Sequence, residues 1–319
     1  MLNYSSNFPK ESKRYSSTLA RQDSRLDPWF VTGFADGDGC FTLSLTKDSK
    51  YKTGWRVKLV FSIGLKKEDI LLLEQIKDYF GVGSIYMQGS EVVRYHVTSE
   101  MDLEVIINHF DKYPLISQKQ TDFLLFKQSF DLIKMKSHLT LDGLIKIVEI
   151  KALMNWGLSD KLQENFPNIS LSIERPLVIN PVIPDPQWVA GFTSGEGNFA
   201  VQIYKAKTTL GEAVKLLFIL TQHVRDQQLM ICLMKYFECG NIFGREGAVD
   251  LKVFKFSDIE QKILPFFEKY PILGVKSKDF IDLSKIAGLM KNKKHLTLEG
   301  LNQIRQIQSN MNSKRTTYI

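Results

Sequence analysis

The strongest constraint on the fold is an internal duplication. A Lys-Tyr-Pro segment at residues 112–114 recurs at 269–271, 157 positions later. Aligned at that spacing, residues 112–155 and 269–312 share 19 identities over 44 positions. Repetition at this level predicts two copies of one structural unit.

The duplication includes an element near the start of each half. Residues 27–39 match residues 185–197 at a spacing of 158. The segment 166–184 between the halves has four prolines and little apolar periodicity, which is typical of a linker. We therefore predict a first repeat over 25–165 and a second over 185–319. Two such halves indicate pseudo-two-fold symmetry, the single-chain form of a dimer, and a chain that functions as a monomer.

Local signals predict where helices begin and end. Asp-Pro at 27–28 and at 185–186 is typical of a helix start, and this first helix is expected to end at a C-cap glycine, Gly39 or Gly197. The last helix of each half is expected to begin at an N-cap threonine, Thr140 or Thr297.

Hydrophobic periodicity predicts the elements between these helices. Alternating apolar residues after the first helix predict two strands, followed by a helix, two shorter strands and closing helical segments. The expected fold is α+β, an αββαββα unit repeated twice, with a twisted antiparallel sheet in each half.

Composition narrows the class of protein. The chain of 319 residues is 44% hydrophobic and 24% charged, which is sufficient for buried cores. No apolar run reaches the roughly 18 residues that span a bilayer, so no membrane partner is expected. A net charge of +7 favours a polyanionic partner. The three cysteines form no disulfide framework or paired metal spacing, which favours a reducing compartment.

Residues 1–24 are polar, serine-rich and partly basic. They are interpreted as a flexible leader, with a transit peptide as the alternative. Pro9 and Glu11 are unfavourable in an amphipathic targeting helix and therefore favour the leader.

The first helix of each repeat has an acid in its last turn, Asp38 or Glu196. A carboxylate at a helix C-terminus costs a few tenths to about 1 kcal/mol, because it lies near the negative end of the helix dipole. A bound divalent cation would offset that cost, and the carbonyls of Gly37 and Gly195 could serve as further ligands.

Small residues in these helices favour close packing of one helix on the other. Gly33 and Gly191 each have a second glycine one turn later. If the helices cross at the pseudo-two-fold axis, the two acids emerge side by side. Paired carboxylates with divalent ions form a phosphoryl-transfer site. A calcium-binding loop is excluded because Cys40 and Lys47 occupy positions that require oxygen ligands.

Residues 31–39 and 189–197 resemble the nine-residue signature of the LAGLIDADG homing endonucleases. The resemblance extends from about residue 25 to the C-terminus. The chain is similar to the monomeric, fungal organellar, intron-encoded members of that family. It implies a site-specific endonuclease that makes a double-strand break in a long double-stranded DNA target by metal-dependent phosphodiester hydrolysis. It also implies a mitochondrial location.

The resemblance assigns roles to matching residues. Asp38 and Glu196 are the implied metal-binding acids, with Gly37 and Gly195 as carbonyl ligands. Mg²⁺ is the expected cation, with Ca²⁺ or Mn²⁺ as substitutes. The implied catalytic residues outside the helices are Lys119 and Lys276, near the scissile phosphates, and Gln222, which orders water. The counterpart of Gln222 is Leu65, a departure that predicts unequal cleavage of the two strands.

The sheets are expected to form a saddle that lies in the major groove, which admits β-ribbons. A strand of 8 to 10 residues at ~3.3 Å each spans about 9 base pairs, so the two halves would read roughly 18 to 20. The predicted DNA-binding residues lie on the polar strand faces: Thr42, Ser44, Thr46, Arg56, Lys58 and Ser62 in the first half, and Asn198, Gln202, Tyr204, Lys205 and Lys215 in the second.

Two other functions remain as alternatives. An intron maturase, an RNA-splicing cofactor, could use the same fold with intron RNA as its partner. A catalytically inactive DNA-binding module is disfavoured by the retained Asp38 and Glu196.

Overall fold

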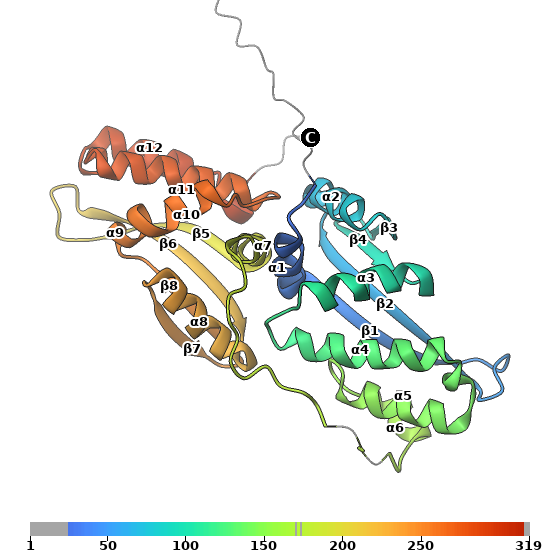
Figure 1. Cartoon of the computed structure of the whole chain (residues 1–319). Helices are drawn as coiled ribbons and strands as arrows, with labels where there is room; N and C mark the ends of the chain where they lie inside the picture. The colour runs from blue at the N-terminus through green and yellow to red at the C-terminus, as the bar shows by residue number, and fades with distance from the viewer. Residues whose placement is uncertain (1–24, 170, 173, 316–319) are drawn as a thin grey trace, which may run out of the picture.

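The computed structural model describes residues 25–169, 171–172 and 174–315 (Figure 1). Helices α1 (Pro28–Asp38) and α7 (Pro186–Glu196) lie side by side at the centre, and one sheet lies on each side of the pair. Both sheets are antiparallel and four-stranded, with the orders β1-β2-β4-β3 and β5-β6-β8-β7. The predicted α+β fold and its pseudo-symmetry are confirmed. The predicted leader, residues 1–24, lies outside the described residues.

The first half begins with α1 and continues into its sheet and covering helices. In chain order, its elements are α1, β1 (Gly39–Lys47), β2 (Trp55–Lys66), α2 (Ile70–Phe80), β3 (Ser84–Gln88), β4 (Val92–Val97), α3 (Glu100–Lys112), α4 (Lys119–Lys134), α5 (Leu141–Leu153) and α6 (Asp160–Asn165).

The second half repeats the order from α1 to α5, but the counterpart of α3 is interrupted. In chain order, its elements are α7, β5 (Gly197–Lys205), β6 (Glu212–His223), α8 (Gln227–Phe237), β7 (Asn241–Arg245), β8 (Ala248–Val253), α9 (Phe256–Asp258), a π-helical turn (Ile259–Ile263), α10 (Leu264–Lys269), α11 (Lys276–Lys291) and α12 (Leu298–Gln308). Pro265 has no backbone N–H, so the regular helical hydrogen-bond ladder cannot continue through it.

Several predicted helix ends are confirmed. The Asp27 and Asp185 side chains accept hydrogen bonds from Trp29 N and Gln187 N, at 2.8 and 2.7 Å. Thr140 and Thr297 cap the last long helix of each half, because each hydroxyl accepts from the backbone N–H three residues on, at 3.2 Å.

The predicted C-cap glycines of α1 and α7, Gly39 and Gly197, are confirmed. Helices α1 and α7 end beside them, and both glycines have extended backbone, with φ of −71° and −72°. Neighbouring atoms leave no space for a side chain at either glycine. A Cβ on Gly39 would lie 2.6 Å from the Ala35 carbonyl oxygen, and one on Gly197 would lie 2.5 Å from Thr193 Cγ2.

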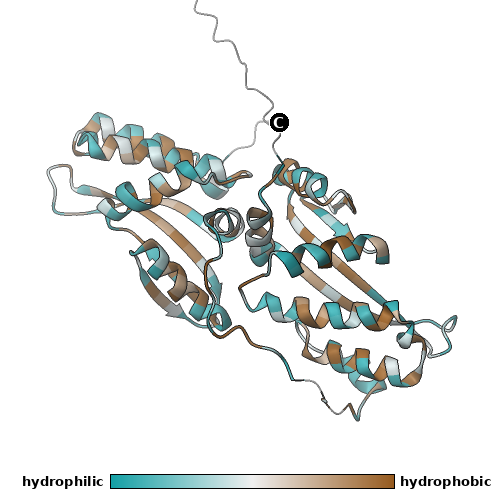
Figure 2. Ribbon diagram, viewed as in Figure 1, coloured by the Kyte–Doolittle hydropathy of each residue, from teal (hydrophilic) through white to brown (hydrophobic). Residues whose placement is uncertain are grey.

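Each half has its own core between the sheet and its covering helices. Phe41 of β1 packs against Phe123 of α4 with ring centroids 5.4 Å apart, and Phe199 of β5 packs against Phe280 of α11 at the same distance. Figure 2 shows apolar residues along the strands and on the helices that cover them. No helix in the described residues is long and apolar enough to cross a membrane.

The chain between α6 and α7 lies against α4. Among its described residues, 166–169, 171–172 and 174–185, there is no helix or strand. Thr121 Oγ1 donates to the Pro176 carbonyl at 2.7 Å, and the Gln118 amide bonds both the N–H and the carbonyl of Val178. Arg175 pairs with Asp122 at 3.2 Å. The connection is therefore attached to the first repeat along much of its length.

Candidate catalytic site at the helix interface

Helices α1 and α7 touch through glycines. A Cβ on Gly33 would lie 2.0 Å from the Trp188 carbonyl oxygen, and a Cβ on Gly191 would lie 2.0 Å from that of Phe30. Both values are far below any real contact, so the two backbones are as close as these glycines permit. The predicted crossing of the two helices through small residues is confirmed.

This crossing brings the two acids together. The space beside Gly195 is filled by Asp38, whose Oδ2 would lie 2.8 Å from a Cβ there. The space beside Gly37 is filled by Glu196, whose Cγ would lie 3.2 Å from a Cβ there. Each carboxylate therefore lies against the helix end that carries the other. A pocket of about 580 Å³ opens beside them, lined by Asp38, Leu65, Asp69 and Lys276 among others.

Burial and charge perturb both carboxyl groups. The pKa of Glu196 is raised to about 7, chiefly by burial and next by the negative charge of Asp38. Burial also raises the pKa of Asp38, against the lowering effect of Lys276 and Lys119. Keeping both carboxylates ionised at neutral pH therefore requires nearby positive charge.

The two predicted catalytic lysines are at this site. Lys119 begins α4, and its Nζ donates to the carbonyls of Gly37 at 2.7 Å and Ala35 at 2.9 Å. Lys276 begins α11, and its Nζ donates to the Gly195 carbonyl. Burial lowers the pKa of both ammonium groups, and the nearby carboxylates act in the opposite direction.

The donor set fits a hard divalent cation. Asp38, Glu196 and the carbonyls of Gly37 and Gly195 supply only oxygen atoms, the ligands that Mg²⁺ and Ca²⁺ prefer. A carbonyl oxygen has two lone pairs, so a lysine hydrogen bond leaves one available. The described residues contain no group of three or more His, Cys, Asp or Glu side chains that could hold a metal ion by themselves. The remaining ligands of any cation would therefore come from phosphate and water.

Gln222 and Leu65 occupy matching positions in the two sheets. In the strand pairing, Leu65 of β2 lies opposite Val93, and Gln222 of β6 lies opposite Val249. The Gln222 side chain lowers the pKa of Glu196. Leu65 lines the pocket beside Asp38 but has no polar group to offer. The two acids therefore have different neighbours.

The outer face of the first sheet carries most of the residues predicted from its alternation. Strand register pairs Thr46 with Arg56 and Ser44 with Lys58, on the side opposite the core. Ser62 shares this face but is only 4% exposed, because Arg94 Nη1 donates to its Oγ at 3.2 Å. Arg94, which the sequence reasoning missed, covers Ser62 and bonds Gln88 Oε1 at 2.7 Å.

In the second sheet, four of the five predicted residues lie on the outer face. Asn198, Gln202 and Tyr204 are exposed and share the outer face of β5, and Lys215 pairs with Gln202. Lys205 is exposed but follows the core-side alternation at the end of the strand. The apolar–polar alternation ends at Lys205, because successive strand residues point to opposite faces and Tyr204 already lies on the outer face. The DNA-binding role of Lys205 stays a prediction.

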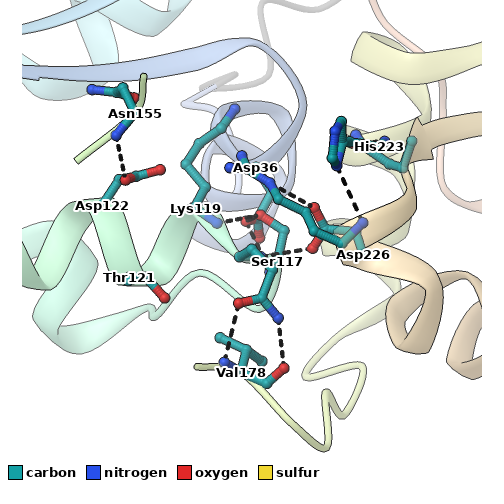
Figure 3. Close-up of polar contacts among 12 residues, drawn as sticks. Asp36, Ser117, Lys119, Thr121, Asp122, Asn155, Val178, His223 and Asp226 are labelled. Atoms are coloured by element: carbon teal, nitrogen blue, oxygen red, sulfur yellow. Dashed lines mark hydrogen bonds and ion pairs between the residues drawn. The ribbon is translucent and has the colours of Figure 1, made fainter. Parts of the chain in front are cut away.

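The sequence reasoning also missed Asp36, which is only 2% exposed. Its carboxylate accepts from Ile116 N, Ser117 N, Ser117 Oγ and Trp188 Nε1, at distances of 2.6 to 3.1 Å (Figure 3). Asp36 thereby holds the loop that leads to Lys119 and joins it to α7. The second motif copy has Ser194 at the position of Asp36. This difference is the sequence signal that the two halves are not alike at that position.

The chain matches a family of known proteins and several curated relatives. The LAGLIDADG endonuclease family model matches residues 31–130 and 189–287. The chain is 41% identical over 302 residues to probable intron-encoded endonuclease 3 of Neurospora crassa. That match covers 93% of this chain and 56% of the Neurospora protein, so the chain spans little more than half the length of that relative.

Solved structures of similar size match along nearly their whole length. The I-SmaMI LAGLIDADG homing endonuclease bound to cleaved DNA has a TM-score of 0.89 at 45% identity, with 91% of this chain and 98% of that chain covered. I-SmaMI bound to an uncleaved DNA target in the presence of calcium ions has a TM-score of 0.88 at 45% identity, with 90% and 99% covered. With both repeats matched in sequence and in fold, this chain belongs to the LAGLIDADG endonuclease family.

Proposed function

We propose that this chain is a site-specific DNA endonuclease that breaks both strands of one long target with the paired acids Asp38 and Glu196. The observation that carries the proposal is the glycine-mediated crossing of α1 and α7, which brings each acid side chain against the end of the opposite helix, beside two lysines. The test is the selection of cleaved sites from a randomised duplex library in Mg²⁺, with a parallel reaction in EDTA.

The proposed chemistry divides between cation ligands and other groups. Asp38, Glu196 and the carbonyls of Gly37 and Gly195 would hold divalent cations, which activate water and stabilise the leaving oxyanion when bound. The ammonium groups of Lys119 and Lys276 stabilise negative charge that develops on the scissile phosphates. Gln222 orients a water molecule through its amide beside Glu196.

Cofactor, partner and location form part of the proposal. The cation is Mg²⁺, and the oxygen-only donor set supports it. One chain carries both repeats, so the protein acts as a monomer on double-stranded DNA. Its similarity to an intron-encoded endonuclease of a filamentous fungus supports a mitochondrial location.

DNA is proposed to lie along the outer faces of both sheets. These faces carry Arg56, Lys58, Arg94, Lys215 and Lys252, which offer positive charge to phosphates, among hydroxyl and amide side chains that suit base edges. Strands β1 and β5 have 9 residues each and β2 and β6 have 12 each, so each sheet covers about 9 to 12 base pairs. Two sheets around one central site give a target of roughly 20 base pairs.

Salt should weaken DNA binding steeply. Neutralising about six phosphates releases their counterions, so affinity should fall roughly a thousandfold between 50 and 200 mM salt. Fluorescence anisotropy with a catalytically inactive variant measures this fall. Lys58→Ala should reduce the slope of log affinity against log salt by about 0.9. Lys161→Ala, on exposed α6, is the matched control and should leave the slope unchanged. A flat salt titration would contradict binding in the groove.

The asymmetry at Gln222 and Leu65 should appear as unequal strand cleavage. Gln222→Leu removes the proposed hydrogen bond to water beside Glu196 and should slow cleavage about tenfold, since such a bond contributes on the order of 1 kcal/mol. Leu65→Gln is the reciprocal control and should retain cleavage. On supercoiled substrate, the wild-type chain should produce a transient nicked circle. No nicked intermediate, together with unchanged rates in Gln222→Leu, would show that the difference has no catalytic effect.

A further inference from the structure

Helices α4 and α11, which begin at Lys119 and Lys276, each follow a loop whose last backbone N–H donates a hydrogen bond to an aspartate of the opposite repeat. Asp226 Oδ1, in the second half, accepts from Gln118 N at 2.7 Å. Asp69 Oδ1, in the first half, accepts from Val275 N at 2.6 Å. The two bonds are pseudo-symmetric, since both partners in the first half have their counterparts 157 residues later. In one bond the acceptor acid belongs to the second repeat, and in the other it belongs to the first repeat.

Each capped residue is next to a catalytic lysine. Gln118 is the N-cap of α4, which begins at Lys119, and Val275 is the N-cap of α11, which begins at Lys276. A hydrogen bond at the N-cap fixes the backbone one residue before the lysine. A displaced cap would therefore displace the lysine from the Gly37 or Gly195 carbonyl that it now contacts.

Each capping acid is attached to the DNA-facing sheet of its own half. Asp226 ends a short 3₁₀ turn that follows β6, and Asp69 ends the equivalent turn after β2. In Figure 3, Asp226 reaches from the second repeat to the segment that carries Ser117 and Lys119. The position of one sheet therefore determines the anchor of the lysine in the other half.

The burial of Asp226 and the backbone conformation of Gly274 favour these two hydrogen bonds. Asp226 is 4% exposed, so its carboxylate needs partners that offset the cost of burial, and the Gln118 N–H is one of them. Gly274 precedes Val275 with a left-handed φ of +73°, and a Cβ there would lie 2.5 Å from Asp69 Oδ1. The glycine thus permits both the turn and the approach of Asp69.

Anchors from the same half complete the arrangement. Ile116 N donates to Asp36 Oδ2 at 3.0 Å, and Leu273 N, its counterpart, donates to Ser194 Oγ at 3.1 Å. Each loop is therefore held both by the first helix of its own half and by an acid from the opposite repeat. The Asp226 and Asp69 anchors depend directly on how the two repeats sit relative to each other.

We propose that Asp226 and Asp69 are positioning residues that act across the two repeats of the chain. Asp226 positions the side chain of Lys119, and Asp69 positions that of Lys276. The inference rests on the proposed function of the two lysines. Its consequence is that each lysine is correctly placed only when the opposite repeat is docked, which makes the two cleavage events depend on both halves of the DNA target.

Double-mutant cycles on single-turnover cleavage of the selected target test the assignment. Asp226→Ala should slow cleavage about tenfold, less than the hundredfold of a 1 Å misplacement, because Asp36 still holds the loop. Combined with Lys119→Ala it should add no further loss, whereas combined with Lys276→Ala the two losses should multiply. Asp69→Ala should give the mirrored pattern, with no added loss only on the Lys276→Ala background.

Controls separate positioning from folding and from charge. Asp226→Asn keeps an acceptor oxygen and should retain most of the rate. Glu68→Ala removes the same charge beside Asp69, and the Glu68 carboxylate makes no hydrogen bond or ion pair with any residue that the structure describes. Its cleavage rate should match that of the wild-type chain. Amide hydrogen exchange in the metal-free protein should accelerate at Gln118 in Asp226→Ala and at Val275 in Asp69→Ala.

Four results would overturn the inference. The first is a further loss when Asp226→Ala is added to Lys119→Ala. The second is an unchanged rate in Asp226→Ala while Lys119→Ala is slow, which would leave the proposed function intact. The third is an unchanged rate in Lys119→Ala itself, which would remove the proposed role of the lysine as well. A loss of rate that only follows a fall in melting temperature, and is not rescued by Asn, would assign Asp226 to stability alone.

Discussion

Asp38→Asn is expected to reduce double-strand cleavage on the order of a thousandfold or more, and Glu196→Gln is expected to do the same. Each substitution removes the negative charge that would hold a cation but keeps the shape of the side chain. Loss of a preorganised electrostatic group of this kind typically costs 10²- to 10³-fold, and loss of a cation ligand should cost at least as much. The measurement is single-turnover cleavage of the selected target in Mg²⁺.

DNA affinity should survive in both variants. Asp38 and Glu196 repel phosphate, so replacing either with an amide should leave binding unchanged or slightly stronger. The fold should also be retained, because burial raises the pKa of both carboxyls and their ionised forms are not a source of stability. Wild-type cleavage by either variant would contradict the assignment of the acids.

The second large effect is structural. Gly33→Ala or Gly191→Ala should reduce the free energy of unfolding by at least about 3 kcal/mol, the upper end of ordinary overpacking. Each new Cβ would meet a backbone carbonyl oxygen of the facing helix at 2.0 Å, so relief requires α1 and α7 to separate. Separation would move the two acids apart, and cleavage should be lost together with stability. Thermal or urea denaturation measures the first effect, and target cleavage measures the second.

Gly288→Ala is the matched control. Gly288 lies within α11, where an added Cβ would have no neighbouring atom within 4 Å and the backbone has no left-handed φ. Alanine is a better helix former by roughly 0.5 to 1 kcal/mol, so this variant should be slightly more stable and fully active. Equal stability of Gly33→Ala and Gly288→Ala would show that the close helix contact is not required.

Those parts of the fold that repeat in the sequence can be predicted from it. The duplication, the Asp-Pro helix starts and the glycines of α1 and α7 are sufficient to predict two α+β units that meet through these helices. Local signals of this kind act within one element, where spacing fixes which face a residue occupies. The capping threonines, Thr140 and Thr297, are predictable for the same reason.

Features that depend on tertiary contacts cannot be predicted in the same way. The sequence predicts a C-cap at Gly39, but it does not show that the neighbouring Ala35 carbonyl is what excludes a side chain there. The Asp226–Gln118 bond joins residues 108 positions apart, and no periodicity relates them. Arg94 covers Ser62 from a different strand. Each of these is set by which segments the fold brings together.

Asp36 is a residue of the motif itself whose role could not be predicted from the sequence. Its neighbour Asp38 stands out because an acid recurs at that position in both repeats, whereas Asp36 matches Ser194 and offers no repeat signal. In the structure, Asp36 links Ser117, Trp188 and the loop before Lys119. Comparison of the repeats therefore identifies Asp38 and Glu196, whose acidic character the two halves share, and gives no role to Asp36, which only the first half has.

The most direct test of the proposed activity is to sequence the ends produced when the chain is incubated with a randomised duplex library in Mg²⁺. We expect one site of roughly 20 base pairs to be enriched, with both strands cut near its centre, and no site to be enriched in EDTA or with Asp38→Asn. Failure to enrich any site, or cutting that persists after both Asp38 and Glu196 are replaced, would contradict the proposed activity.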